Sequence, residues 1–192
     1  MTREEILDIL GKSSALLSGH FELSSGVHSE QYIQCALALQ YPKYAAWFAR
    51  SIAEKFRTEM ITVVLSPAVG GIVLGQEVAK AVGARAIFSE RENGKMVLRR
   101  GFGLDKNDRV IIVEDVITTG STVEELISLA KSAEARILGV ASIVNRSSGN
   151  LSFKDRFEYL IKIQTKNYPP DKCLLCKEGK PATKPGSRNL QK

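Results

Sequence analysis

The sequence predicts an α/β protein with a parallel central sheet flanked by helices. Short apolar runs alternate along the chain with segments of helical periodicity, which is the order expected of parallel βα units. Residues 110–113 are four consecutive apolar residues, which indicates a strand buried on both faces of a sheet. The length of 192 residues and the hydrophobic content of 44% suit one domain with a sizeable core.

The expected elements follow one another in a regular order. Thr2 precedes an amphipathic pattern that runs to Leu10, so a capped helix is expected at the start of the chain. Residues 21–29 are turn-rich, and residues 89–108 are polar and charged, so a long lid-like loop is expected there. Strands are expected over residues 62–65, 84–88, 110–113, 137–144 and 159–163, and further helices over residues 44–56, 71–82 and 121–133.

The formal net charge of +6 is confined to the C-terminal tail. Residues 162–192 hold eight basic and two acidic side chains, whereas residues 1–161 hold 19 of each. Nucleic-acid binding by the whole protein is therefore not expected. No apolar run approaches the roughly 18 residues of a membrane span, and the start does not resemble a signal peptide. A cytoplasmic location without membrane contact is expected.

The cysteines do not predict a disulfide framework, since the chain has only three. Cys173 and Cys176 have the spacing of half a zinc site, but the sequence offers no second such pair and no neighbouring histidine. Reduced, unliganded thiols are expected there, with four thiolates from two tails of a dimer as the alternative. Cys35 is expected to be a packing residue. His20 and His28 are expected at surface or turn positions, with a ligand contact as the alternative for His28.

The most informative segment follows the buried strand at 110–113, because open parallel sheets bind ligands at the carboxyl ends of their strands. There Glu114 and Asp115 precede a hydroxyl-rich run, residues 118–122, that opens a helix. Hydroxyls and helix-start N–H groups suit a phosphate, and Gly120 lets the backbone approach it closely. The carboxylates would repel a phosphate, but they suit sugar hydroxyls, a cation or a developing positive charge. A sugar-phosphate site is predicted; a solvated strand end followed by an N-cap is the alternative.

Residues 110–122, VIIVEDVITTGST, resemble the phosphoribosyl-pyrophosphate (PRPP) motif of the type I phosphoribosyltransferases. Other segments resemble the orotate phosphoribosyltransferase subfamily, and the resemblance covers about residues 15–165. These segments are FELSSGVHS at residues 21–29 with Tyr32, SPAVGG at residues 66–71 and IVNR at residues 143–146.

The resemblance implies the type I phosphoribosyltransferase fold and a transferase that joins the ribose 5-phosphate of PRPP to orotate. The products would be orotidine 5′-monophosphate and pyrophosphate, in the de novo synthesis of pyrimidines. Mg²⁺ held through PRPP is the implied cofactor, with no metal ligand from the protein, and a homodimer with shared lids is the implied assembly. The implied parts are a phosphoribosyltransferase domain at residues 1–165, with an N-terminal hood at about 1–40 and a mobile lid at about 89–103, and a basic C-terminal extension at 166–192.

The resemblance also implies roles for matching residues. Glu114 and Asp115 would hold the ribose hydroxyls, with Asp115 also favouring positive charge at the anomeric carbon. Lys95, with Arg91 as second choice, would be the lid cation that stabilises the departing pyrophosphate, and Arg146 would pair with the carboxylate of orotate. The implied PRPP contacts are Glu114, Asp115, Val116, Ile117, Thr118, Thr119, Gly120, Ser121, Thr122, Arg91, Lys95, Ala68, Val69, Gly70 and Gly71. The implied orotate contacts are Thr118, Arg146, Ser25, Gly26 and Tyr32, with Ser24 and Ser29 beside them.

Two other functions stay open at this point. The PRPP motif alone also fits a phosphoribosyltransferase for purine bases; residues 21–29 and Arg146 are what favour orotate. The second alternative is a PRPP-sensing regulator that binds nucleic acid through a basic surface. No helix-turn-helix pattern precedes the core, and a lid would have no role in such a regulator.

Overall fold

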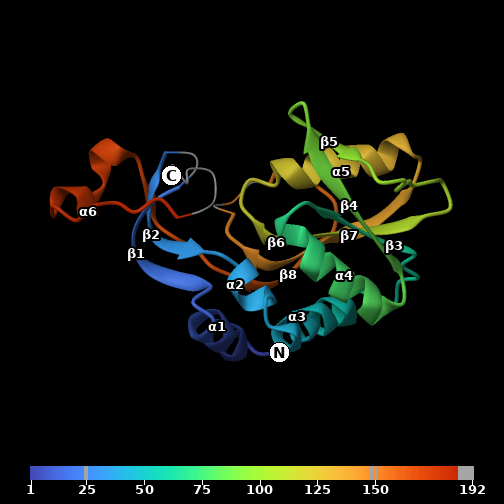
Figure 1. The fold of residues 1–192 in the computed structure, drawn as a ribbon, viewed down its shortest axis with the longest axis horizontal. Coiled ribbons are helices and arrows are strands. Elements are labelled where there is room, and N and C mark those ends of the chain that lie inside the picture. Colours follow the sequence, from blue (N-terminus) through green and yellow to red (C-terminus); the bar gives the residue numbers. More distant parts are fainter. Residues whose placement is uncertain (24–25, 148, 150, 186–192) are drawn as a thin grey trace.

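The computed structural model describes residues 1–23, 26–147, 149 and 151–185. The expected orotate contact Ser25 and its neighbour Ser24 lie outside these described residues. Figure 1 shows a large α/β unit and, beside it, a small sheet to which both ends of the chain contribute.

A six-stranded sheet with the strand order β5-β4-β3-β6-β7-β8 forms the centre of the large unit. Neighbouring strands are parallel, except that β4 and β5 form an antiparallel hairpin at one edge. The predicted parallel sheet is confirmed, and each of its five expected strands is present. The strands are β3 (Val63–Pro67), β4 (Arg85–Glu92), β5 (Lys95–Leu98), β6 (Arg109–Ile117), β7 (Arg136–Asn145) and β8 (Phe157–Lys162).

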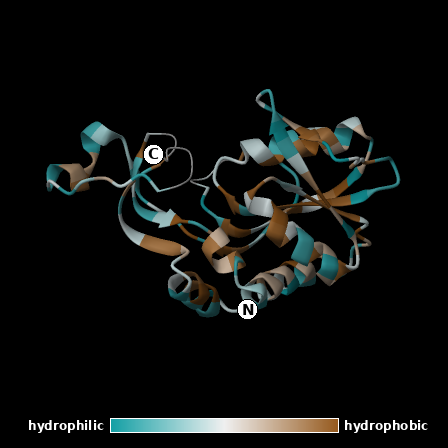
Figure 2. Ribbon diagram, in the orientation of Figure 1, coloured by the Kyte–Doolittle hydropathy of each residue, from teal (hydrophilic) through white to brown (hydrophobic). Residues whose placement is uncertain are grey.

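Helices cover both faces of this sheet, as the sequence predicts (Figure 1). One face packs against α3 (Pro42–Lys55) and α4 (Gly70–Val82), and the other packs against α5 (Ser121–Ser132). Successive side chains of a strand point to opposite faces, so a strand covered on both sides needs a continuous apolar run. In β6, Ile111 and Val113 pack with α3 and α4, while Val110 and Ile112 pack with α5. Figure 2 shows the hydrophobic residues concentrated along these central strands.

Helix α1 (Arg3–Lys12) begins at the predicted position. The hydroxyl of Thr2 accepts a hydrogen bond from the Glu5 N–H at 3.3 Å, and the Thr2 N–H donates to the Glu5 carboxylate at 2.8 Å. This capping box satisfies N–H groups that a helix start leaves without a partner. A short helix, α2 (Ala36–Leu39), precedes α3. Among the described residues, no helix combines the length and the apolar character needed to cross a membrane.

Residues 89–98 form part of a β-hairpin, so the expectation of a loop over all of residues 89–108 is wrong for this half of the segment. Strand β4 continues to Glu92, which pairs with Lys95 at the start of β5. The turn consists of Asn93 and Gly94, whose φ angles are 50° and 82°. Two positive φ angles define the hairpin turn that Asn-Gly favours, so the Asn-Gly pair is the feature of the sequence that indicates a β-hairpin here.

The small sheet has the order β1-β2-β9. We call its antiparallel strands β1 (Leu16–Glu22) and β2 (His28–Ile33) the hood hairpin, and residues 166–185 the tail. Strand β9 (Asn167–Tyr168) of the tail pairs with β2, and Thr183 pairs with β1. The tail therefore runs along both edges of the hood hairpin, although its sequence shows no periodicity. Between these contacts lie a single 3₁₀ turn, η1 (Pro170–Lys172), and a short helix, α6 (Leu174–Lys177).

Candidate functional site

The acidic pair lies at the carboxyl end of β6, as predicted for a ligand site in a parallel sheet. Glu114 and Asp115 are both half-buried. Burial, reinforced by the charge of Asp115, raises the pKa of Glu114 to about 8. Burial also raises the pKa of Asp115, against the opposing effect of backbone hydrogen bonds that include one from the Val116 N–H at 2.9 Å. Adjacent carboxyls that resist ionisation are typical of sites that await a ligand.

Residues 118–122 turn the chain from β6 into α5. Gly120 has a φ of 87°, and a side chain there would come within 2.7 Å of the Phe153 ring, so only glycine fits. The hydroxyl of Thr119 accepts a hydrogen bond from the Ser121 N–H at 3.4 Å. Since α5 begins at Ser121, the first N–H groups of the helix lie beside the hydroxyls of Thr119 and Ser121, which are 3.3 Å apart. This arrangement suits a phosphate.

The loop between β3 and α4 brings a second stretch of backbone to the acidic pair. A methyl group at Gly70 would lie 3.3 Å from Oδ1 of Asp115, so the carboxylate sits directly over this glycine. A methyl group at Gly71 would lie 3.2 Å from the Val113 carbonyl oxygen, so α4 begins in close contact with β6. The Ala68 N–H donates to a carbonyl of β4 at 2.8 Å. Because the Ala68 N–H is already used, the N–H groups of this segment that could bind an anion are those in the first turn of α4.

Arg146 and Tyr32 reach the same site from other elements. The Arg146 N–H donates to the Ile117 carbonyl at 2.8 Å, which ties the residue after β7 to the end of β6. Its Nη2 donates to Thr165 Oγ1 at 2.8 Å, whereas its buried Nε has no hydrogen-bond partner among the described residues. Burial lowers the pKa of Arg146. Burial and the charge of Asp115 raise the pKa of Tyr32, and the charge of Arg146 lowers it, so Tyr32 lies near both groups.

The cations of the β4–β5 hairpin differ in their surroundings. Arg91 makes a two-pronged ion pair with Glu125 of α5, with N–O distances of 2.8 and 3.2 Å. Lys95 is exposed and, within the described ranges, takes part in no ion pair. Lys95 is thus free to meet a ligand, whereas Arg91 would first have to leave Glu125. The other two hairpin cations also have partners, Arg99 with Glu92 and Arg100 with Glu90.

Only some of the residues expected at the site lie close together in the structure. The acidic pair, residues 118–122, Gly70, Arg146 and Tyr32 come together around the end of β6. Ser29 is 1% exposed and paired with β9, and Gly26 has a φ of 80° in the turn of the hood hairpin. Sequence reasoning missed Thr165, because no local pattern marks the hydrogen-bond partner of a distant arginine.

The minor candidates also have defined positions. Cys35 is 1% exposed, as expected of a packing residue, and burial together with the charge of Asp115 raises the pKa of its thiol well above the usual value. The expectation that His20 and His28 lie at surface or turn positions is wrong. They are 7% and 8% exposed, because the tail covers the hood hairpin there.

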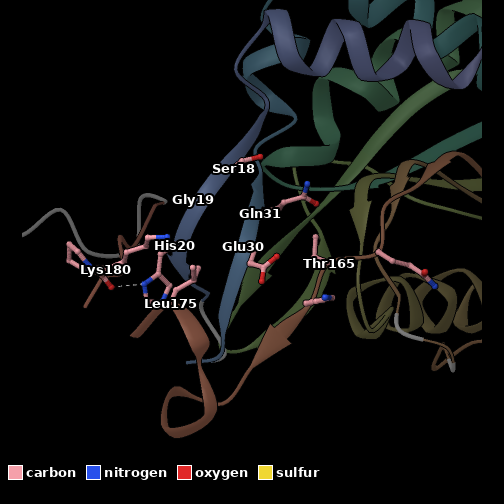
Figure 3. Close-up of a pocket in the computed structure, with 11 residues that line it drawn as sticks. Ser18, Gly19, His20, Glu30, Gln31, Thr165, Leu175 and Lys180 are labelled. Carbon is pink, nitrogen blue, oxygen red and sulfur yellow. Dashed lines mark hydrogen bonds between the residues drawn. The ribbon is translucent and has the colours of Figure 1, made fainter. Parts of the chain in front are cut away.

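A cavity of about 690 Å³ lies between the hood hairpin and the tail, and Figure 3 shows residues of both around it. Glu30 and Gln31 of β2 line one side, and Leu175 of α6 another. Thr165, which binds Arg146, is also part of the lining, but no residue of the acidic pair or the phosphate loop is. The cavity is therefore a neighbour of the site at β6 and not its centre.

A parallel sheet whose central strand ends in an acidic pair and a hydroxyl-rich glycine loop defines a phosphoribosyl-transfer protein. The model of the phosphoribosyl transferase domain family matches residues 39–168. Within that class, the chain belongs to the orotate phosphoribosyltransferase family. It is 50% identical over 190 residues to the orotate phosphoribosyltransferase of Caldanaerobacter subterraneus subsp. tengcongensis, covering 99% of this chain and 100% of that protein. The enzyme of the same name from Chlorobium phaeobacteroides is also 50% identical, covering 99% and 98%.

Solved structures confirm the type I phosphoribosyltransferase fold that the resemblance implies. The orotate phosphoribosyltransferase of Aeropyrum pernix matches with a TM-score of 0.69 at 21% identity, over 91% of this chain and 98% of that one. The adenine phosphoribosyltransferase of Rhodothermus marinus matches with a TM-score of 0.67 at 19% identity, over 84% and 100%. Since proteins named for orotate and for adenine share this fold, the fold alone does not select the base.

Proposed function

We infer that this protein transfers the ribose 5-phosphate unit of PRPP to orotate. The bond between the anomeric carbon and the pyrophosphate oxygen breaks, and a bond from that carbon to a ring nitrogen of orotate forms. The products are orotidine 5′-monophosphate and pyrophosphate. Support comes from relatives of this name that match the chain over nearly its whole length at close to half identity.

The single observation that favours orotate over a purine is the unused donor of Arg146. A buried donor without a partner costs about 1–3 kcal/mol, so a ligand that satisfies Nε gains that amount on binding. The planar guanidinium matches a carboxylate and an adjacent carbonyl with two parallel hydrogen bonds. Orotate has both groups, whereas adenine, guanine and hypoxanthine have no carboxylate. Tyr32, close to Arg146, would cover the ring.

The remaining roles follow from charge and position. Residues 118–122 would wrap the 5′-phosphate with hydroxyls and helix-start N–H groups. Glu114 and Asp115 would bind the ribose hydroxyls, and Asp115 would stabilise the positive charge that develops at the anomeric carbon. The first turn of α4 at Gly70 would receive the pyrophosphate. Such a site works mainly by positioning its reactants and by electrostatic stabilisation.

We propose Mg²⁺ as the cofactor. Glu114 and Asp115 offer carboxylate oxygens at this end of β6, and a hard cation of this kind prefers oxygen donors. Bound through PRPP, Mg²⁺ would neutralise part of the negative charge of the leaving pyrophosphate. The acidic pair would then lie near a cation that favours its ionised form.

We propose that the protein works as a homodimer in which the β4–β5 hairpin of one subunit acts on the site of the other. The hairpin projects from the main sheet at the edge formed by β5, at the opposite end of the strand order from β8 (Figure 1). Lys95 at the start of β5 is exposed and would supply the lid cation. Arg91 would contribute only after its ion pair with Glu125 opens.

The base preference is tested by measuring pyrophosphate release from PRPP and Mg²⁺ with orotate, uracil, adenine, guanine and hypoxanthine. Turnover is expected with orotate alone, and Arg146→Lys should raise the KM for orotate at least about tenfold because it keeps the charge but loses the fork. Arg136→Lys, at the exposed start of β7, is the matched control and should leave the KM unchanged. Activity with only a purine would contradict the choice of base. Binding of PRPP without turnover of any base would favour a regulator.

A further inference from the structure

Four potential metal ligands outside the PRPP site meet where the tail crosses the hood hairpin. His20 lies in β1, His28 opens β2, and Cys173 and Cys176 belong to the tail. One ligand atom from each of them lies within 4.8 Å of every other. We propose that these four side chains bind one Zn²⁺ ion, as a structural site that fastens the tail to the hood hairpin.

The distances match the edges of a tetrahedron around zinc. Zinc lies about 2.0–2.1 Å from histidine nitrogen and about 2.3 Å from cysteine sulfur, so tetrahedral ligand atoms are about 3.3–3.8 Å apart. Sγ of Cys173 lies 3.4 Å from Nε2 of His20. Sγ of Cys176 lies 3.3 Å from Nδ1 of His28 and 3.7 Å from Nε2 of His20. These three edges need almost no rearrangement to accept the metal.

Of the distances described here, the one between the two histidine nitrogens is shorter than an edge of the tetrahedron. Nε2 of His20 and Nδ1 of His28 are 2.8 Å apart, which is a hydrogen-bond distance. Zinc binding would replace this hydrogen bond and separate the nitrogens by about half an ångström. A rotation of either ring within the cluster supplies such a shift. The hydrogen bond therefore describes the metal-free form of the same site.

A hydrogen bond to the tail orients His20 for metal binding. Nδ1 of His20 lies 2.8 Å from the Lys180 carbonyl oxygen, the dashed contact in Figure 3. A carbonyl can only accept, so Nδ1 carries the proton and Nε2 presents its lone pair to the other three ligands. Histidine ligands of metals are usually held by such a bond on their second nitrogen. This tautomer is the one that zinc requires.

The backbone of the tail places both sulfur atoms on one side. Cys173 is the N-cap of α6, and its carbonyl accepts a hydrogen bond from the Lys177 N–H at 3.2 Å. Cys176 lies in the same turn, which Gly179 closes with a φ of 72°. Two cysteines separated by two residues in a tight turn are half of many structural zinc sites. The histidines of the hood hairpin supply the other half.

The chemistry of the ligand set favours Zn²⁺ over the harder cations. Two thiolates and two imidazoles in a tetrahedron suit zinc, whereas Mg²⁺ and Ca²⁺ prefer oxygen. On binding, each thiol loses its proton to solvent, so two thiolates balance the charge of the ion while the histidines stay neutral. The site as a whole is then uncharged. A neutral cluster is compatible with the burial of His20, His28 and Cys173.

The tail needs such an anchor, because it has little hydrophobic core. Its pairing with β2 comprises two residue pairs, and Leu174 at the start of α6 is 54% exposed. Its other contacts are polar and include backbone hydrogen bonds of Thr183, a hydrogen bond from the Tyr168 hydroxyl to Glu30 at 3.2 Å and an exposed ion pair of Lys184 with Glu22 at 2.7 Å. Exposed ion pairs contribute little to stability. Small units without a core often depend on a metal instead.

The test measures metal in the full-length protein, purified with a phosphine reductant, loaded with Zn²⁺ and passed through a weak chelating resin. Elemental analysis is expected to give about one Zn²⁺ per chain for the wild type and less than about a tenth of that for Cys176→Ser and His28→Ala. Cys35→Ala is the matched control, since Cys35 is a buried cysteine outside the cluster, and it should keep the metal. Retention of Zn²⁺ by both cluster variants would overturn the proposal.

A second measurement on the wild type does not depend on the folding of any variant. Replacing Zn²⁺ by Co²⁺ should produce the strong visible bands of a tetrahedral ion together with thiolate-to-metal charge transfer in the near ultraviolet. The weak spectrum of six-coordinate Co²⁺ would overturn the assignment of the ligands. A wild-type protein that retains no metal, or whose intact mass shows a Cys173–Cys176 disulfide despite the reductant, would overturn it as well.

Discussion

Glu114 keeps its proton at neutral pH in the ligand-free protein, because its pKa is about 8. The cause is burial, to which the charge of Asp115 adds. A cation or a positively charged transition state beside these groups lowers both pKa values again. Without a ligand, the carboxyls have lost much of their hydration and gain nothing in return. A positive charge that develops in the transition state compensates for this loss, and an electrostatic site gains selectivity for the transition state in this way.

The pKa of Glu114 makes the stability of the free protein depend on pH. The folded value of about 8 lies above the usual 4.5, so this contribution is complete below about pH 4.5 and is lost as the pH rises through 8. Glutamine does not ionise, so Glu114→Gln should remove this loss. The difference in Tm, variant minus wild type, should grow between pH 5 and pH 8 in thermal unfolding followed by circular dichroism. A difference that stays constant with pH would contradict the raised pKa.

Asp115→Asn should separate activity from stability. Loss of the carboxylate should lower kcat/KM at least about a hundredfold, since it removes the group that we propose to stabilise the developing positive charge. The Tm should stay level or rise, because a desolvated carboxyl that opposes folding is also removed. Steady-state kinetics and thermal unfolding of the same preparation measure both effects. Asp171→Asn, exposed in the tail, is the control and should match the wild type in kinetics.

At the scale of elements, the β4–β5 hairpin is a projection in which Lys95 is the cation that lacks an ion-pair partner within the described part of the chain. Its Asn93-Gly94 turn fixes the register, and the ion pair of Arg91 with Glu125 anchors it to α5. Arg91 is held in this way, whereas Lys95 is exposed and has no ion-pair partner among the described residues, so Lys95 is the better candidate for a ligand contact. If this hairpin is the lid proposed above, we expect it to close as a unit.

Lys95→Ala should lower kcat about tenfold or more and leave the Kd of orotate nearly unchanged. In its proposed role, the cation would stabilise the departing pyrophosphate, which is absent when orotate binds alone. Single-turnover kinetics and orotate titration by calorimetry would measure the two quantities. Lys106→Ala, exposed outside the hairpin, is the matched control. Wild-type turnover by Lys95→Ala would transfer the role to Arg91.

Mixing two impaired variants tests whether the hairpin serves the partner subunit. In a mixed dimer of Lys95→Ala and Asp115→Asn, a shared lid leaves one site with both residues intact. Random exchange of subunits should then restore about a quarter of wild-type activity. If each hairpin serves its own subunit, every site lacks one residue and the activity of the mixture stays at the mean of the two variants.

The strands of the main sheet could be predicted because burial on both faces forces continuous apolar runs, as at residues 110–113. The acidic pair and residues 118–122 could be predicted because they follow directly on such a strand. The hood hairpin could not, since a bulge between Ser18 and Phe21 interrupts the alternation that marks a strand. Strand β9 has two residues, too few for any pattern.

At the scale of the whole molecule, the zinc cluster lay beyond sequence reasoning for a different reason. Two histidines or one pair of cysteines is by itself a weak signal of a metal site in a sequence, and the two halves of the ligand set lie near opposite ends of the chain. They meet only because β9 pairs with β2 and Thr183 pairs with β1. Pairing of two such short segments depends on tertiary packing, which no local window of sequence contains.

Removal of the metal should affect orotate more than PRPP. The hood hairpin carries Gly26 and Tyr32, which the proposed function places over the base, whereas the phosphate loop belongs to the main sheet. Stripping Zn²⁺ with a chelator should raise the KM for orotate at least about threefold and change the KM for PRPP little. The readout is initial-rate kinetics with excess Mg²⁺ restored, and added Zn²⁺ should reverse the effect. Equal changes in both constants would contradict a coupling through the hood hairpin.

Because the tail lies along both edges of the hood hairpin, we expect the two sheets to form in a fixed order during synthesis. The main sheet is complete once β8 (Phe157–Lys162) has emerged, whereas β1 and β2 still lack their edge partners at Asn167 and Thr183. A two-stranded hairpin alone is marginally stable in water. Although β1 is among the first segments synthesised, its sheet is thus the last to form. We expect the core of the nascent chain to fold before β1 and β2 gain their edge partners at Asn167 and Thr183.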